Sequence, residues 1–344
     1  MKKVISLIIV LFISVSSLSL TMTAAKETGD FVCGIWKYSV YPDHVTITGV
    51  TTPVSGKIEI PAELDGHKID YVTINDFKKN DQITEAVIGE GIEYIASSIF
   101  TGCKNLKKVT LPSTLERISC DAFLNCISLT DINIPDSLIY VEPDMFSGCT
   151  ALKEIKLPET WSEVNMRLFK GCTSLETITI PSKVRSIASS AFEGCTSLKN
   201  VYLSDGLKEI KREAFKDCTS LKQITVPSTV EEIGNNAFEG CSSLTDITLC
   251  TGLKNVYQYA FKDCTSLREI KIPSTVKVID NYIFDGCTNL EKITLNEGVL
   301  GIGYSSFKNL TSLKSFTVPV SLDFEQKTIY PFDGCTGLTE VKFA

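Results

Sequence analysis

One pattern of apolar and polar positions repeats every 23 residues along most of the chain. A fixed period in the twenties is typical of a solenoid, in which each coil buries its apolar face only against its neighbours. The octapeptide AFKDCTSL even occurs twice, at 214–221 and 260–267. A phenylalanine marks each copy, which predicts twelve coils: Phe77, Phe100, Phe123, Phe146, Phe169, Phe192, Phe215, Phe238, Phe261, Phe284, Phe307 and, after a longer step, Phe332.

Each copy predicts the same short elements. In LKQITV (221–226) apolar and polar residues alternate, which indicates a short half-buried strand. Pro227 ends that strand because proline cannot donate to a ladder. The next apolar pair, in VEEI (230–233), fits either a second short strand or an extended turn. The segment NNAF (235–238) is expected to form one helical turn that carries its phenylalanine inward.

The turn after the strand uses proline in some coils and glycine in others. The glycine turns contain Gly91, Gly206, Gly252 and Gly298. From residue 204 onward the two kinds alternate, which explains why the octapeptide recurs after two periods. The sequence therefore indicates a two-coil unit of duplication.

The repeating unit F-x-x-C-x-x-L-x-x-I-x-I-P-x-x-V-x-x-I resembles the BspA-like branch of leucine-rich repeats over residues 57–344. It departs from the general leucine-rich pattern because its cysteine precedes the leucine by three residues. The stretch 26–56 resembles the N-terminal cap of that family, since FVCGIWKYSV and HVTITGV flank a Tyr-Pro-Asp turn and predict a β-hairpin. The resemblance implies an α/β repeat solenoid with a parallel sheet of short strands. It also implies a curved binding scaffold, secreted or surface-attached, without catalytic residues.

The first 25 residues have the features of a secretory signal peptide. Lys2 and Lys3 precede the apolar run VISLIIVLFISV (4–15), and small residues follow at 23–25. The run is too short to span a bilayer comfortably. Cys33 lacks the context of a lipid-modified cysteine. We therefore expect a secreted or cell-surface protein without a membrane span.

The charge of the chain makes nucleic acid an unsuitable partner. The formal net charge is −7, and it becomes −9 when the signal peptide is removed with Lys2 and Lys3. No cluster of lysine and arginine offers a stripe that could follow a phosphate backbone. The acidity is expected to keep an extracellular rod in solution.

Ten of the thirteen cysteines share one position in the repeat: Cys103, Cys126, Cys149, Cys172, Cys195, Cys218, Cys241, Cys264, Cys287 and Cys335. Stacked coils hold equivalent Cβ atoms about 4.8 Å apart, whereas a disulfide requires about 3.8 Å. One coil has Leu310 there instead, so we expect a column of small buried thiols. A linear column also cannot supply four ligands in a tetrahedron to zinc. Cys33, Cys120 and Cys250 lie off the column, and no pairing can be assigned to them.

The sequence contains no set of residues typical of an active site. His44 and His67 are the only histidines, and phosphate loops, zinc motifs and paired CxxC motifs are absent. We therefore expect neither an enzyme nor a cofactor. One alternative places an enzyme or inhibitor activity around Trp36, His44 and His67. The acidic residues on the outward side of the strands are interpreted as a solvated ladder: Asp131, Glu154, Asp246 and Glu269.

One outward column forms the candidate ligand face: Lys156, Thr179, Tyr202, Thr225, Thr248 and Lys271. Threonine also simply suits an exposed strand, so the column has a purely structural interpretation as well. Tyr202 would be its aromatic anchor. Trp161, which replaces a leucine or valine of other coils, is expected to be a satellite core residue.

These observations favour a secreted or surface scaffold that binds extracellular proteins, in adhesion or recognition. The alternatives are a structural surface rod without a ligand and a binding module of a larger extracellular enzyme system. The last coil leaves two further options open. SLDFEQKTIYP (321–331) folds over the open end as a local cap, or two molecules associate weakly through the C-terminal edge.

Overall fold

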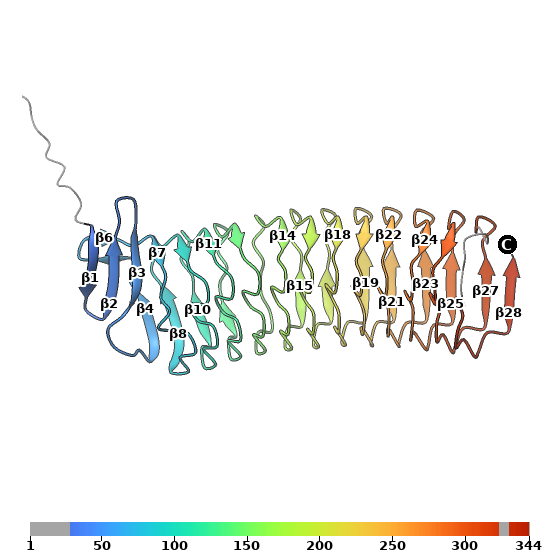
Figure 1. Ribbon diagram of the computed structural model, residues 1–344, viewed down its shortest axis with the longest axis horizontal. Helices are drawn as coiled ribbons and strands as arrows, with labels where there is room; N and C mark the ends of the chain where they lie inside the picture. The colour runs from blue at the N-terminus through green and yellow to red at the C-terminus, as the bar shows by residue number, and fades with distance from the viewer. Residues whose placement is uncertain (1–27, 323–329, 344) are drawn as a thin grey trace, which may run out of the picture.

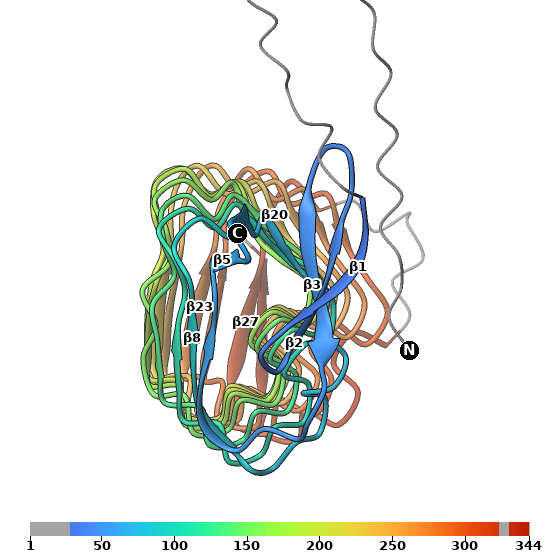
Figure 2. The ribbon, with the colours of Figure 1, turned by 90° about the vertical axis from the view of Figure 1, so that its left-hand side faces the viewer.

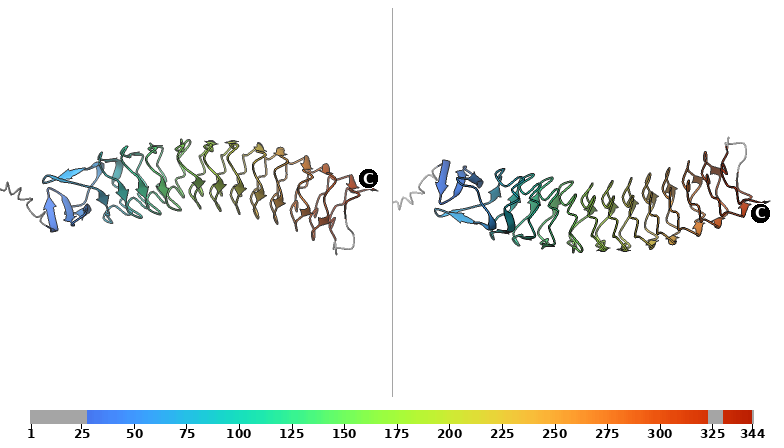
Figure 3. Two further views of the ribbon diagram at one scale, coloured as in Figure 1. Left: turned by 90° about the horizontal axis from the view of Figure 1, so that it is seen from above. Right: turned by 90° about the horizontal axis from the view of Figure 1, so that it is seen from below.

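The chain is an elongated, gently curved stack of coils (Figures 1 and 3). The computed structural model describes residues 28–322 and 330–343. The expected signal peptide and most of the expected C-terminal cap lie outside these residues. Seen along the long axis, the coils superpose as one loop around a shared core (Figure 2).

The main row of parallel strands occupies the LxxIxI segments. In the coil that contains residues 154–157 the segment is not a regular strand, so the row has thirteen positions in all. The first main-row position, β4, precedes Phe77, and the last, β28, follows Phe332. Twelve phenylalanines therefore separate thirteen positions, and the expected count of twelve coils is one too low. The strands are β4 (Gly56–Ile60), β8 (Ile83–Ile88), β10 (Lys108–Thr110), β12 (Asp131–Ile132), β15 (Thr177–Thr179), β17 (Asn200–Tyr202), β19 (Gln223–Val226), β21 (Asp246–Leu249), β23 (Glu269–Ile272), β25 (Lys292–Leu295), β27 (Ser315–Val318) and β28 (Glu340–Phe343).

A second row of two-residue strands runs along another side of the coils, so the second apolar pair of each repeat forms a strand. Its members are β7 (Tyr71–Val72), β9 (Tyr94–Ile95), β11 (Arg117–Ile118), β13 (Tyr140–Val141), β14 (Glu163–Val164), β16 (Ser186–Ile187), β18 (Glu209–Ile210), β20 (Glu232–Ile233), β22 (Asn255–Val256), β24 (Val278–Ile279) and β26 (Gly301–Ile302). Both rows are parallel, as the one-direction winding of a solenoid requires.

The N-terminal end is closed by antiparallel strands. The expected hairpin is β2 (Trp36–Val40) and β3 (Val45–Val50), and β1 (Gly29–Cys33) adds a third strand to it. Strand β3 pairs in parallel with β7, so this cap continues the second row. A smaller hairpin, β5 (Glu63–Leu64) and β6 (His67–Lys68), interrupts the first coil. Trp36 packs edge-on against Phe77 at 6.4 Å and ends the phenylalanine stack.

The segment around each phenylalanine forms a third row of contacts, and here the expected helical turn is wrong. The residue two positions before the phenylalanine has a left-handed φ, for example 58° at Asn236 and 59° at Tyr259, which a right-handed helix cannot contain. Within the described part of the chain no helix occurs, so the α/β class is not confirmed and the fold is an all-β solenoid. The Phe215 N–H donates to the carbonyl of Ala237 in the next coil at 2.8 Å. Every phenylalanine from Phe100 to Phe307 makes the equivalent bond.

The phenylalanine column is the centre of the core. Neighbouring rings stack with centroids 5.3 Å apart for Phe192 and Phe215 and 5.7 Å apart for Phe238 and Phe261. All rings from Phe77 to Phe307 are fully buried. Such offset stacking adds roughly 0.5–1.5 kcal/mol per pair to the hydrophobic gain of burial.

The cysteine column consists of free thiols, as expected, but each thiol also has a polar partner. Cys218 Sγ donates to the carbonyl oxygen of Phe192 at 3.2 Å, and the Phe192 carbonyl also accepts the Cys195 N–H at 3.1 Å. The same thiol bond recurs from Cys103 to Cys335. Each of these carbonyls from Phe77 to Phe261 therefore accepts one bond from its own coil and one from the next.

Pairing in the main row follows the alternation of proline and glycine turns. Strand β15 pairs with β17, β19 with β21 and β23 with β25, and each pair joins a proline coil to the following glycine coil. In the described residues, five pairs of adjacent main-row positions have no strand pairing between them. In each pair the later coil has a proline directly after its main-row segment: Pro158, Pro181, Pro227, Pro273 and Pro319. Pairing also occurs before Pro112 and Pro135, but over only three and two residues.

The direction of the backbone N–H groups explains this alternation. Successive N–H groups of a strand point to opposite neighbours. Ile180 donates forward to Tyr202 at 2.9 Å, so the next residue, Pro181, would have to donate backward and cannot. Within a pair, glycine permits close approach, since a Cβ at Gly252 would overlap the carbonyl oxygen of Ser228.

Both strand rows break at one position, next to Trp161. No pairing joins β12 to the coil of residues 154–157 or β13 to β14 in the part of the chain described. Trp161 is 3% exposed and belongs to the main core, in line with Leu138 and Val184, so it is larger than its neighbours in that column. Its Nε1 donates to the Leu138 carbonyl at 2.7 Å, where the equivalent carbonyls of Ile92 and Leu115 accept the hydroxyls of Thr114 and Ser137.

The register predicts very different costs for two substitutions in neighbouring parts of one coil. Phe215→Ala removes a fully buried ring and should lower the free energy of unfolding by ~3–5 kcal/mol. Thr225→Ala changes an exposed side chain and should alter it by less than about 0.5 kcal/mol. Thermal and urea unfolding of both variants measure the difference, and equal effects would contradict the register.

The thiol column should be reduced and slow to alkylate in the native protein. Burial raises the pKa of Cys103 to about 11 and that of Cys172 to about 12, so the reactive thiolate is scarce at neutral pH. Raising the pH to about 9 should speed alkylation of a small model thiol in solution far more than that of the column. Because these thiols ionise more easily in the unfolded chain, stability should fall as the pH rises above about 9. Mass spectrometry of alkylated protein measures the reactivity, and disulfides between column cysteines would refute the interpretation.

Candidate functional site

The outer face of the main row displays the six candidate residues in six successive coils. All six side chains are exposed, and strand pairing places Thr179 beside Tyr202 and Thr225 beside Thr248. Lys271 lies beside Thr294, outside the six. Lys156 belongs to the irregular segment 154–157. The column is thus continuous, although its backbone is divided by the unpaired positions.

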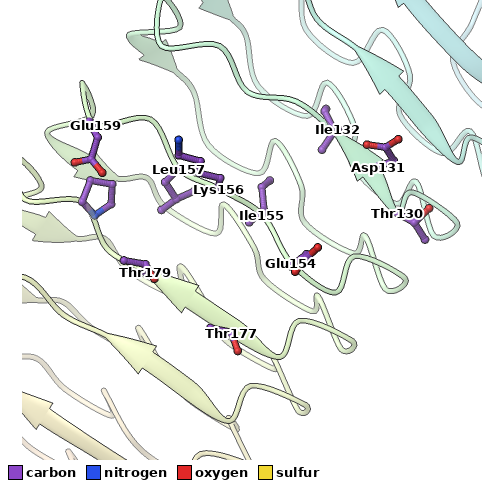
Figure 4. A pocket seen from close by; sticks show the side chains of 11 residues that line it. Thr130, Asp131, Ile132, Glu154, Ile155, Lys156, Leu157, Glu159, Thr177 and Thr179 are labelled. Carbon is purple, nitrogen blue, oxygen red and sulfur yellow. The ribbon is translucent and has the colours of Figure 1, made fainter.

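A first groove, here called the Lys156 groove, lies where two consecutive positions of the main row are unpaired (Figure 4). It encloses about 570 Å³ between β12, residues 154–159 and β15. Ile132, Ile155 and Leu157 contribute apolar surface, and acidic groups surround Lys156. Within the described chain, Lys156 forms no ion pair, so its ammonium group is available to a ligand. The polar lining residues are Thr130, Asp131, Glu154, Lys156, Glu159, Thr177 and Thr179.

A second groove, here called the Tyr202 groove, lies between the unpaired strands β17 and β19 and encloses about 520 Å³. Its lining contains Tyr202 and Thr225 but neither lysine nor arginine. The half-buried Cys250 lies at its edge. Two carboxylates, from Asp205 and Asp246, make the groove acidic.

The structure thus brings only part of the candidate column into grooves. Lys156 and Thr179 line the first groove and Tyr202 and Thr225 the second, whereas Thr248 and Lys271 line neither. Asp131, Glu154 and Asp246, expected to belong to a solvated ladder, line these grooves, which the alternation of apolar and polar residues does not predict. A proline directly after the later segment is the sequence signal that both grooves share, although the segments before Pro112 and Pro135 are paired.

The two histidines near the N-terminus, His44 and His67, pack against aromatic rings. His44 stacks on Tyr41 at 4.5 Å, packs edge-on against Tyr71 at 4.8 Å and bonds to Asp43 at 2.8 Å. That bond lowers the pKa of the Asp43 carboxyl. His67 lies against Tyr38 instead, at 6.2 Å. The two histidines therefore contact different partners.

The described residues also give no sign of two other kinds of site. No group of three or more histidine, cysteine, aspartate or glutamate residues among them is arranged to hold a metal ion. Residues 28–322 and 330–343 contain no helix that is long and apolar enough to cross a membrane.

Comparison with known families identifies the repeat. The family described as BspA type leucine rich repeat region (6 copies) matches residues 70–199, 162–283 and 254–344, which together cover more than half of the chain. No curated protein matches this sequence.

Solved structures of bacterial leucine-rich repeat proteins are similar in fold. A protein from Bacteroides ovatus superposes with a TM-score of 0.74 at 23% identity, over 91% of this chain and 88% of the other. A leucine rich cell surface protein from Faecalibacterium prausnitzii gives a TM-score of 0.54 at 24% identity, over 93% and 96%. The pneumococcal vaccine antigen PcpA gives a TM-score of 0.54 at 18% identity, over 92% and 88%. At these identities the comparisons show the fold alone.

Proposed function

This chain belongs to the BspA-type leucine-rich repeat family, and on that basis we propose that it is a surface or secreted scaffold that binds extracellular proteins through the outer face of its main row. Repeat scaffolds of this family are typical of bacterial surface proteins, and leucine-rich repeat proteins bind proteins. We also propose that the chain is secreted and acts in adhesion or recognition. The observation that carries it is a continuous exposed column beside two grooves that the core does not need.

The chemistry of this face suits a protein ligand. Tyr202 is 58% exposed at the middle of the column, where an aromatic anchor contributes most. Lys156 and Lys271 offer cationic groups on either side of it, while Glu154 and Glu159 offer anionic groups in the Lys156 groove. A partner with both charges at matching positions would be steered and oriented by this face.

The proposal predicts that three substitutions on this face abolish binding without unfolding the protein. The variant Tyr202→Ala, Lys156→Glu, Lys271→Glu should bind a partner at least about tenfold more weakly, since it loses an anchor and reverses two charges. The probe is a panel of purified extracellular matrix and surface proteins, measured by biolayer interferometry with the chain from residue 28 onward.

A matched control separates this face from the rest of the surface. Tyr140 is 58% exposed, like Tyr202, but lies on the second row. The variant Tyr140→Ala, Lys68→Glu, Lys277→Glu makes the same change in charge and should leave binding within about twofold. Equal losses in both variants, or full binding by the first, would move the site elsewhere. A panel without any binder would favour the structural rod.

We also propose weak self-association through β28. Val341 is 46% exposed on this strand, which pairs with β27 among the described residues. A dimer in sedimentation at micromolar concentration should become a monomer in Val341→Lys. Ile139→Lys, at a similarly exposed position directly before β13, should not change the mass of the dimer. A dimer that persists in Val341→Lys would refute this edge as the interface.

A further inference from the structure

The Tyr202 groove combines features that point to a ligand of another chemical class. It exists because Pro227 cannot donate backward to the coil of β17, so β17 and β19 lie side by side without ladder bonds. Strand β17 ends at Tyr202, and β19 ends just before Pro227. The ring of Tyr202 therefore stands at an opening of the sheet surface instead of on a closed ladder.

Both faces of the Tyr202 ring are uncovered by other rings. Its neighbours in the column are Thr179 and Thr225, which are small, and no ring contact involves Tyr202 in the described parts of the chain. The rings of some other surface tyrosines are covered: Tyr259 stacks on Tyr282 at 5.1 Å, and the Arg117 guanidinium lies over Tyr140 at 5.5 Å. An uncovered ring face presents a flat apolar surface with a hydroxyl at its edge. The C–H face of a pyranose ring packs on such a surface.

Uncharged and acidic polar groups surround this ring. The lining includes the amides of Asn200 and Gln223, the carboxylates of Asp205 and Asp246 and the hydroxyl of Ser228. For Gln223, Asp205 and Asp246 no side-chain hydrogen bond or ion pair is found with any described residue. Amides donate and accept, and a carboxylate accepts two bonds, so these groups match vicinal hydroxyls of a sugar. A few placed polar groups beside an apolar surface are the usual make-up of a small-molecule site.

The negative charge of the lining disfavours anionic sugars as ligands. Two carboxylates without lysine or arginine would repel the carboxylate of a uronic or sialic acid and the sulfate of a sulfated sugar. The Lys156 groove differs in this respect, because it contains an ammonium group. We propose that the Tyr202 groove binds a short neutral oligosaccharide, with one sugar ring on Tyr202 and its hydroxyls on Gln223, Asp205 and Asp246.

Cys250 provides a direct reporter for this site. Its half-buried thiol lines the groove, whereas the half-buried Cys120 lies far away in the sequence, in the coil of β11, and does not line it. A bound sugar should slow alkylation of Cys250 by N-ethylmaleimide and leave Cys120 unaffected. The probes are neutral oligosaccharides of glucose, galactose, mannose and N-acetylglucosamine, together with sialylated and sulfated counterparts, at millimolar concentration. Because the assay contains no protein partner, its outcome is independent of the protein panel.

We expect at least one neutral oligosaccharide to slow Cys250 alkylation threefold or more, and saturation-transfer NMR to show binding of the same sugar. Tyr202→Ala and Gln223→Ala should each weaken that binding at least tenfold, Tyr202→Phe should retain it, and Tyr140→Ala should not change it. Protection by none of the neutral sugars, protection only by acidic ones, or binding that survives Tyr202→Ala would each overturn the proposal.

Discussion

The coils are held together by the phenylalanine of each repeat, through both its ring and its backbone. The ring stacks on the rings before and after it, the N–H donates to the next coil, and the carbonyl accepts the thiol of the next coil's cysteine. These contacts need Phe and Cys at a fixed spacing, which explains why the two columns are nearly unbroken. They also recur where the strands do not pair, as at Phe146, whose N–H bonds to Leu168 at 3.0 Å although β13 and β14 are unpaired.

Because the third row of contacts, around each phenylalanine, ties the coils together, the main row is free to vary. Proline after a strand removes one backward donor, and glycine in the alternate coil allows close approach to the serine carbonyl before it. The result is a sheet of paired strands with grooves between the pairs. The Tyr202 groove therefore follows from the same two-coil alternation that repeats the octapeptide AFKDCTSL, whereas the Lys156 groove lies between consecutive proline coils.

Much of the fold follows from the sequence, because the residues that each coil buries recur at the same positions of every repeat. The phenylalanine and cysteine columns, the main strands and the outward column with Tyr202 were all predictable from periodicity and from the substitution of Leu310 for cysteine. The turn around Asn236 was not, since four residues cannot distinguish a helical turn from one with a left-handed φ of 58°. The grooves were not predicted either, because the effect of Pro227 depends on which neighbour its missing N–H would face. Trp161 was expected at the margin of the core, yet it lies within it, where both strand rows break.

Native-state hydrogen exchange of individual amides is the most direct test of the central claim. It shows whether the third row of contacts, around each phenylalanine, joins coils whose strands are not paired. The account predicts that the Phe146 and Phe169 amides exchange only through global unfolding, like that of Phe215. The amides of Glu154 and Glu163, which face unpaired positions, should exchange far faster than those of Asp246 and Asn255, their counterparts in paired strands, which donate to the preceding coil. Fast exchange of Phe146, or equal protection of Glu154 and Asp246, would contradict the account.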